Sequence, residues 1–288
     1  MKKKTSKTKE TIKEYTSLIF FAFILTSSII QGSRIPTGSM MNTILIGDQI
    51  MVNKLAYNLT TPRNIPYTDI RLPHYTFNLF GDPERNDIVV FEFPGEQNEL
   101  YDTEFDSYVK RCVGEPGDKV EIIDRVLFVN DKEFPIPAKI RYAKMGTEKR
   151  GISDQRIFPK NAGWNGDNYG PIIIPKKGEI VNLTTENIEQ YRKIINLEYG
   201  KEVVTVSGNR ILVNGKETDT YKVKKDQYFM IGDNRDNSWD SRYWGFVSRD
   251  NIVGQPLFVY FSWDSDIPFS QFGKLLGSIR WNRIGKIL

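Results

Sequence analysis

A serine hydroxyl is the first group in this sequence that could serve as a nucleophile. Ser39 stands between Gly38 and Met40 in the segment Ile35–Asp48, which reads IPTGSMMNTILIGD. Glycine permits a tight turn that would expose the hydroxyl and let a substrate approach the backbone closely. A Gly-Ser pair is usually only part of a loop, so a catalytic interpretation needs a general base that takes the serine proton.

A buried lysine is the best candidate for that base. The single histidine, His74, lies in a proline-rich stretch (RLPHYTF) without an evident partner, which does not favour a Ser-His-Asp triad and indicates a surface or loop residue. Lysine can take its place where burial disfavours the ammonium form. Lys110 lies in a strand-like run (YVKRCV), where alternation places it on the opposite face from Val109 and Arg111. The alternative is a solvated lysine on a strand surface.

The cysteine and histidine content limits other chemistries. With Cys112 as the one cysteine, no intrachain disulfide can form. One cysteine and one histidine cannot make a cluster of metal ligands of these types. Cys112 shares the predicted face of Lys110 and is interpreted as a small buried side chain. Hydrolysis by a serine and a lysine requires neither a metal nor a cofactor, so none is expected.

A third segment, Phe229–Val247 (FMIGDNRDNSWDSRYWGFV), is unusually rich in Asp, Asn, Arg and Ser for a turn. Such a run can form a hydrogen-bonded scaffold in which Asp233 and Asp240 pair with arginines while a hydroxyl reaches the lysine. The alternative is a polar hairpin with ion pairs and no part in catalysis.

The elements that would position these residues are mostly strands. Short runs rich in Val, Ile, Tyr and Phe alternate with Gly, Asn, Asp and Pro, which predicts strands joined by turns. The clearest runs are Gln49–Val52, Asp87–Phe93, Ser107–Val113, Lys119–Ile123 and Leu257–Trp263. One soluble helix is predicted over Asn187–Ile195.

Two similar segments each predict a hairpin. Arg125–Glu133 (RVLFVNDKE) and Arg210–Glu217 (RILVNGKE) both lead from a strand into an Asn-Asp or Asn-Gly turn. We interpret them as separate pieces of one smaller β domain. The predicted fold class is mainly β: an antiparallel β-sheet core with an inserted smaller β domain, preceded by one N-terminal transmembrane helix.

The apolar stretch Tyr15–Ile30 predicts this helix. Extended to Ile12 and Gln31, it reaches the roughly 20 residues that a spanning helix needs. A basic start and a short apolar core are also typical of a cleavable secretory signal, but the following QGSRIP has no small-x-small site. We therefore expect an uncleaved anchor. The positive-inside rule places the Lys-rich start in the cytoplasm and the chain after Ser33 on the outer side.

The net charge of +4 comes from the two ends of the chain. Residues 1–14 and 267–288 each carry +4, which leaves a net −4 in the middle. Basic ends suit a membrane surface better than nucleic acid, for which no binding is expected. The C-terminal end mixes aromatic and basic side chains: Phe269, Phe272, Trp281, Lys274, Arg280 and Arg283. This end could lie in the membrane interface, or it could be ordinary core followed by a solvated tail.

Together the three segments resemble bacterial type I signal peptidases, the Ser-Lys endopeptidases that release exported proteins from their leader peptides. IPTGSMM at residues 35–41 resembles the nucleophile box, YVKRCVGEPGDKV at 108–120 the general-base box, and GDNRDNSWDSRYWGF at 232–246 the most distinctive box of that family. DIVVF at 87–91 and RWNRIG at 280–285 are also similar to family segments. Residues 57–80 and 135–220 match little.

The resemblance implies a role for each matching residue. Ser39 would be the nucleophile and Lys110 the general base, with Ser238 hydrogen-bonded to the lysine amine. The Ser39 N–H and the Thr37 hydroxyl would form the oxyanion hole. Ion pairs would join Asp233 to Arg111 and Asp240 to Arg242. Substrate would lie as an added strand in shallow pockets for small residues. The residues that would bind it are Ile35, Pro36, Met40, Ile44, Tyr108 and Val109.

Three residues depart from the family pattern. Thr37 replaces a serine and keeps its hydroxyl. Asn42 stands where a proline is usual, which is expected to loosen the turn after the nucleophile. Trp239 occupies a position that is often small, which is expected to change local packing or membrane contact.

The implied domain order begins with a basic cytoplasmic tail at residues 1–14 and a transmembrane anchor at 15–33. The catalytic β core comprises 34–128 and 221–266, the inserted variable β domain 129–220, and the basic aromatic C-terminal segment 267–288.

The predicted function is that of a membrane-bound serine endopeptidase that removes signal peptides from exported preproteins, cleaving after small residues. It is placed in the bacterial inner membrane as a single-pass protein, with the lipid bilayer and preproteins as partners and the export machinery nearby. Two alternatives are a self-cleaving repressor-type Ser-Lys protease and a non-enzymatic membrane-tethered β module. The anchor argues against the first, and the presence of both Ser39 and Lys110 argues against the second.

Overall fold

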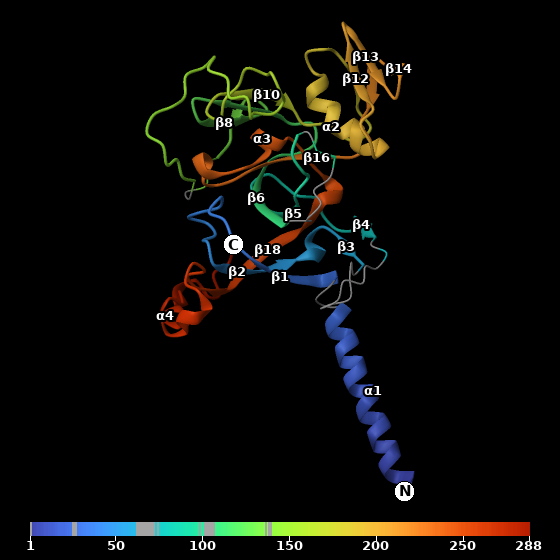
Figure 1. The fold of residues 1–288 in the computed structure, drawn as a ribbon, viewed down its shortest axis with the longest axis vertical. Coiled ribbons are helices and arrows are strands. Elements are labelled where there is room, and N and C mark those ends of the chain that lie inside the picture. The colour runs from blue at the N-terminus through green and yellow to red at the C-terminus, as the bar shows by residue number, and fades with distance from the viewer. Residues whose placement is uncertain are drawn as a thin grey trace.

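A central antiparallel sheet organises the protein (Figure 1). The computed structural model describes residues 2–24, 28–61, 73, 75–97, 99–100, 107–135, 137 and 140–288. Its helices are α1 (Lys2–Ile24), α2 (Ile188–Tyr199), α3 (Ser241–Trp244) and α4 (Phe272–Gly277). Its strands are β1 (Ile30–Arg34), β2 (Asp48–Asn53), β3 (Leu59–Thr60), β4 (Thr76–Phe77), β5 (Ile88–Glu92), β6 (Ser107–Gly114), β7 (Lys119–Ile123), β8 (Val126–Val129), β9 (Lys132–Glu133), β10 (Tyr169–Ile173), β11 (Ile180–Asn182), β12 (Val204–Ser207), β13 (Arg210–Val213), β14 (Lys216–Glu217), β15 (Thr220–Lys222), β16 (Gln227–Ile231), β17 (Val247–Ser248) and β18 (Ile252–Ser262).

The central sheet has seven strands in the order β1-β2-β18-β5-β6-β16-β17. Every neighbouring pair is antiparallel. β2 alternates buried and half-buried side chains along its length, as a strand with one covered face should. The prediction of a mainly antiparallel β protein is therefore confirmed, and the strands expected around residues 49–52, 87–93, 107–113, 119–123 and 257–263 all form.

The two predicted hairpins lie in different sheets. The first hairpin supplies β8 and β9 to a four-stranded sheet, β10-β7-β8-β9, and the second supplies β13 and β14 to the sheet β12-β13-β14. Their cores also differ, because β8 packs against the central sheet through Leu127 and Phe229, whereas Ile211 of β13 packs on α2. The predicted boundary between the catalytic core and the inserted domain, at residues 128/129, falls inside β8. Because β8 pairs with β7, the sheet β10-β7-β8-β9 contains residues from both sides of that boundary.

The helix α1 extends away from the sheets in Figure 1. Its large apolar side chains from Ile12 to Phe21 are 60% to 69% exposed. Within the part of the chain that the structure describes, we find no helix with both the length and the hydropathy needed to cross a membrane. The prediction that the span continues to Ser33 is wrong, because Ile30–Arg34 forms β1. This polar segment satisfies its backbone hydrogen bonds by pairing with β2.

The C-terminal segment supports the loop that carries Ser39. The guanidinium of Arg283 donates to both carboxylate oxygens of Asp48, with 2.9 Å from Nε to Oδ1, and both residues are buried. Arg280 donates to the Ile46 carbonyl at 2.8 Å. Phe269 and Trp281 are each 72% exposed. The segment is therefore not ordinary core followed by a solvated tail, since its arginines bind the loop while these aromatic rings are exposed, and its place in the membrane interface stays a prediction.

Replacing Arg283 by Met should destabilise the protein, because Asp48 would then be buried without its charged partner. Breaking a buried ion pair in this way costs about 3–5 kcal/mol. Urea unfolding followed by circular dichroism measures the loss. Lys274→Met, at an exposed position of the same segment, is the matched control and should change little. Equal stability of the two variants would contradict this account of Arg283.

Candidate active site

Ser39 lies in the turn between β1 and β2, and backbone contacts fix its position. The Met41 N–H donates to the Gly38 carbonyl and the Ile44 N–H to the Met40 carbonyl. From the segment after β16, the Asn234 N–H donates to the Ser39 carbonyl at 2.9 Å. A Cβ at position 232 would lie 2.7 Å from the Ser39 carbonyl oxygen, so the close approach of these two segments requires Gly232.

The turn after Ser39 differs from the expected one. Asn42 has a φ of 81°, in the left-handed region. Proline, whose ring holds φ near about −65°, cannot adopt this conformation, whereas asparagine tolerates it better than most residues. The turn after Ser39 therefore has a backbone conformation that a proline at position 42 could not adopt and that asparagine tolerates, so the residue changes the shape of the turn.

Lys110 of β6 reaches the serine. Its Nζ lies 2.9 Å from Ser39 Oγ and 3.2 Å from the Val109 carbonyl oxygen. The amine is also 5.0 Å from the centre of the Tyr108 ring. Only 3% of Lys110 is exposed, and this burial lowers the pKa of its amine to about 8, although the Asp240 charge acts in the opposite direction. About one molecule in ten therefore has a neutral lysine at pH 7, far more than at the ordinary pKa of 10.5.

Two buried ion pairs surround this contact. Arg111, next to the lysine, donates to Asp233 from Nε at 2.8 Å and from Nη2 at 2.7 Å. Arg242 donates to Asp240 through Nε and Nη2, both at 2.9 Å. Burial opposes ionisation of the Asp240 carboxyl, but the Arg242 charge and hydrogen bonds outweigh it and hold its pKa below the usual value. Thr43 also donates to Asp233, which links the serine loop to the first pair.

The expected hydrogen bond between Ser238 and Lys110 is absent from the described part of the chain. The buried Ser238 hydroxyl makes no hydrogen bond to the lysine amine, which is directed at Ser39 Oγ and the Val109 carbonyl; it lies beside Asp240 and helps to lower the pKa of that carboxyl. The two predicted oxyanion-hole donors, the Thr37 hydroxyl and the Ser39 N–H, likewise donate to no described residue, and Thr37 is exposed.

An open cleft of about 650 Å³ contains Ser39 and Lys110. β16 pairs with β6 only from Arg111 onward, and the cleft opens along the residues of β6 that precede it. Five of the six predicted substrate-binding residues line it: Ile35, Pro36, Met40, Tyr108 and Val109. Ile44 does not, since its side chain is fully buried in the core beneath them.

The cleft also includes residues that the sequence did not indicate. Gln31, Ser33 and Arg34 line it because residues 30–34 form a strand beside the site. The polar character of these three residues is the sequence feature that could have indicated that they lie outside the membrane, at the cleft. Asn237 and Trp239 line it from the segment after β16. Cys112 is buried, as expected. His74 lies outside the described residues. Among the residues that are described, no group of three or more His, Cys, Asp and Glu could hold a metal ion.

A serine hydroxyl in contact with a buried lysine amine, beside a strand in an open cleft, is suited to nucleophilic hydrolysis of an extended peptide.

Comparison with known proteins identifies the particular family. The profile of the family described as signal peptidase, peptidase S26, matches residues 8–263. The chain is 33% identical to signal peptidase I of Buchnera aphidicola subsp. Acyrthosiphon pisum over 93% of this chain and 79% of that one. It is 31% identical to signal peptidase I of Rickettsia typhi, over 93% and 89%, and 30% identical to that of Pseudomonas aeruginosa, over 91% and 77%. The chain belongs to the signal peptidase family and is a serine endopeptidase that removes signal peptides.

Burial of Lys110 should cost stability, which Lys110→Met should recover. The lowering of its pKa from 10.5 to about 8 corresponds to about 3 kcal/mol. Below pH 8 the lysine is protonated in both states and the cost is fully present. Between pH 8 and 10.5 only the unfolded state keeps the proton, so wild-type stability rises with pH.

The measurement is urea unfolding of wild type and Lys110→Met at several pH values. The variant should be more stable at pH 7, and this advantage should shrink as pH rises from 8 to 10.5. Lys201→Met, at an exposed lysine, should show no such advantage at any pH. If the Lys110→Met protein were less stable than wild type at pH 7, burial of the Lys110 amine would not be destabilising.

Proposed function

We propose that the enzyme uses Ser39 as nucleophile and Lys110 as general base, and that it cleaves preproteins after small residues at the end of the signal peptide. The observation that carries the proposal is the 2.9 Å contact between Lys110 Nζ and Ser39 Oγ. The lowered pKa of the lysine supports it, because a base must be unprotonated to accept a proton near the operating pH.

The reaction is an acyl transfer in two halves. Neutral Lys110 takes the proton of the Ser39 hydroxyl as Oγ attacks the carbonyl carbon of the scissile bond. The protonated amine then gives this proton to the leaving nitrogen, and the C–N bond breaks to leave an acyl-enzyme. In the second half Lys110 takes a proton from water, the resulting hydroxide attacks the ester, and Ser39 Oγ recovers a proton as the signal peptide leaves.

The Thr37 hydroxyl and the Ser39 N–H are proposed to stabilise the oxyanion of each tetrahedral intermediate. Support comes from their position in the cleft and from their lack of described acceptors. The Arg111–Asp233 and Arg242–Asp240 pairs would hold β6 and the segment after β16 in register with the serine loop. Ser238 would orient the amine only after a small rearrangement, since no hydrogen bond joins the two groups here.

Substrate is proposed to lie along the cleft as a strand added beside Tyr108–Lys110. The apolar side chains of Ile35, Met40 and Val109 at the cleft would leave shallow pockets that suit small substrate residues. Met40 is only 2% exposed, so little depth remains for a large side chain.

The enzyme is also proposed to work at the bacterial inner membrane, with its N-terminus in the cytoplasm and its catalytic sheet on the outer side near the export machinery. The exposed apolar side chains of α1 and the Lys-rich start support this arrangement. Signal-peptide-bearing preproteins would present their cleavage sites there.

Ser39→Ala and Lys110→Met should each abolish cleavage of a purified preprotein, and the double variant should be hardly slower than either, because the two groups act as one unit. Sequencing the N-terminus of the wild-type product locates the cleaved bond. Circular dichroism checks that the variants fold. Substantial turnover by either single variant would refute the proposed dyad.

Thr37→Val tests the oxyanion hole, since valine keeps the shape of threonine without its donor. Loss of one such donor lowers kcat by about 10²–10³. KM should change little, because the donor acts on charge that develops in the transition state. Thr37→Ser, which deletes only a methyl group, should stay close to wild type. If the valine variant were as active as the wild type, the Thr37 hydroxyl would not be an oxyanion-hole donor, and the residue would only line the cleft.

A further inference from the structure

Trp239 presents a large, fixed surface to the cleft. It lines the cleft together with Tyr108 and Lys110, and its side chain is half-buried. Its indole stacks on the ring of Tyr243, with the ring centres 4.5 Å apart and an angle of 17° between the planes. The indole Nε1 donates to Glu96 Oε1 at 2.9 Å. A ring held both by stacking and by a hydrogen bond cannot turn aside for a substrate without losing one of these contacts.

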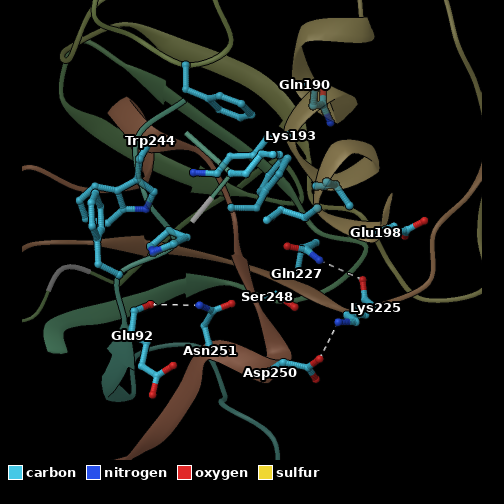
Figure 2. A pocket seen from close by; sticks show the side chains of 17 residues that line it. Glu92, Gln190, Lys193, Glu198, Lys225, Gln227, Trp244, Ser248, Asp250 and Asn251 are labelled. Atoms are coloured by element: carbon cyan, nitrogen blue, oxygen red, sulfur yellow. Dashed lines mark hydrogen bonds and ion pairs between the residues drawn. The ribbon is translucent and has the colours of Figure 1, made fainter. Parts of the chain in front are cut away.

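Two side chains, those of Lys193 and Gln97, hold the loop that carries Glu96. The amine of Lys193 on α2 donates to the Gly95 carbonyl and, at 2.7 Å, to the Glu96 carbonyl. The Gln97 side-chain amide donates to the carbonyl of Tyr243, the residue on whose ring Trp239 stacks. Figure 2 shows Lys193 entering from α2 at the rim of a second cavity, of about 350 Å³, with Trp244 on the other side. Lys193 is half-buried, and this burial lowers the pKa of its amine to about 7.

Side chains on the two faces of β6 contact different apolar clusters, which gives the cleft two different walls. Val109 packs with Ile35 and Met40, whereas Tyr108, on the opposite face, packs against a second apolar cluster that Trp239 also contacts. Side chains of a substrate strand alternate in the same way. The small residue before the scissile bond, P1, would face Ile35 and Met40. The residues on either side of it, P2 and P1′, would then face Trp239.

We propose that Trp239 is a specificity-determining residue that limits the size of the substrate side chains at P2 and P1′, and that Glu96 and Lys193 are its positioning residues. The proposal rests on the function proposed above. It assigns a role in the active site to α2, since the helix fixes a loop that in turn fixes one wall of the cleft.

Peptides that span a cleavage site, with Ala or Phe at P2, P1′ or P3, provide the test. The ratio of kcat/KM for Ala to that for Phe is measured at each position. Trp239→Ala should lower this ratio by about tenfold or more at P2, at P1′ or at both, a size typical for removal of a steric wall. The ratio at P3, which faces away from Trp239, should stay at its wild-type value. Trp281→Ala, at an exposed tryptophan, is the matched control.

The positioning residues are tested with conservative pairs. Glu96→Ala should relax the P2 or P1′ ratio in the same direction as Trp239→Ala but less, whereas Glu96→Gln keeps an acceptor for the indole and should retain wild-type selectivity. Lys193→Met should also relax the ratio, and Lys201→Met should not. If Trp239→Ala fails to fold, the comparison of Glu96→Ala with Glu96→Gln decides the question.

The outcomes separate the two proposals. Wild-type protein that cleaves none of the peptides and no preprotein would overturn the proposed function. Wild-type protein that cleaves them, with unchanged ratios in Trp239→Ala, would overturn the role of Trp239. A uniform loss of activity at every position, without a change in any ratio, would also overturn it, since a merely structural residue would act in that way.

Discussion

The structure depends on keeping one lysine amine out of water and within hydrogen-bond distance of a serine hydroxyl. Lys110 is 3% exposed and lies 2.9 Å from Ser39 Oγ. Ionised lysine is costly to bury, so the fold accepts a local loss of stability in return for an amine that can take a proton near neutral pH. The surrounding aromatic rings of Tyr108 and Trp244 exclude water without supplying a counter-charge in direct contact.

Buried ion pairs then join the separate chain segments that meet at this amine. Asp233 bridges β6, through Arg111, and the serine loop, through Thr43. Asp48 joins the end of that loop to Arg283 near the C-terminus. Such pairs contribute little net stability, but they are costly to break. They hold segments that are far apart in the sequence in one geometry, which the proposed reaction of Ser39 and Lys110 requires.

The part of the chain beyond the central sheet is connected to the site in a similar way. α2 belongs to a small core of its own with β12 and β13. Its Lys193 nevertheless reaches the loop at residues 95–97, and through Glu96 it reaches Trp239 in the cleft. The family profile extends across this region, although residues 135–220 contain none of the family segments recognised in the sequence. If Trp239 has the proposed role, α2 influences which substrates fit the cleft without touching them.

The sequence by itself determined four strands of the central sheet, β2, β5, β6 and β18, and a helix over residues 187–195, because local alternation and turn residues specify such elements before any packing occurs. His74 has no evident partner in the sequence, which made Lys110 a candidate base, and the resemblance of the three segments to signal peptidases implied that Ser39 and Lys110 act together. Only the tertiary structure decided that residues 30–34 pair with β2, that Ile44 lies beneath the cleft rather than in it, and that Arg283 is a support for the serine loop. It also decided the connection from Lys193 to Trp239. These features arise from contacts between residues far apart in the chain. The type of a single residue does not specify which distant residue it will contact in the folded protein.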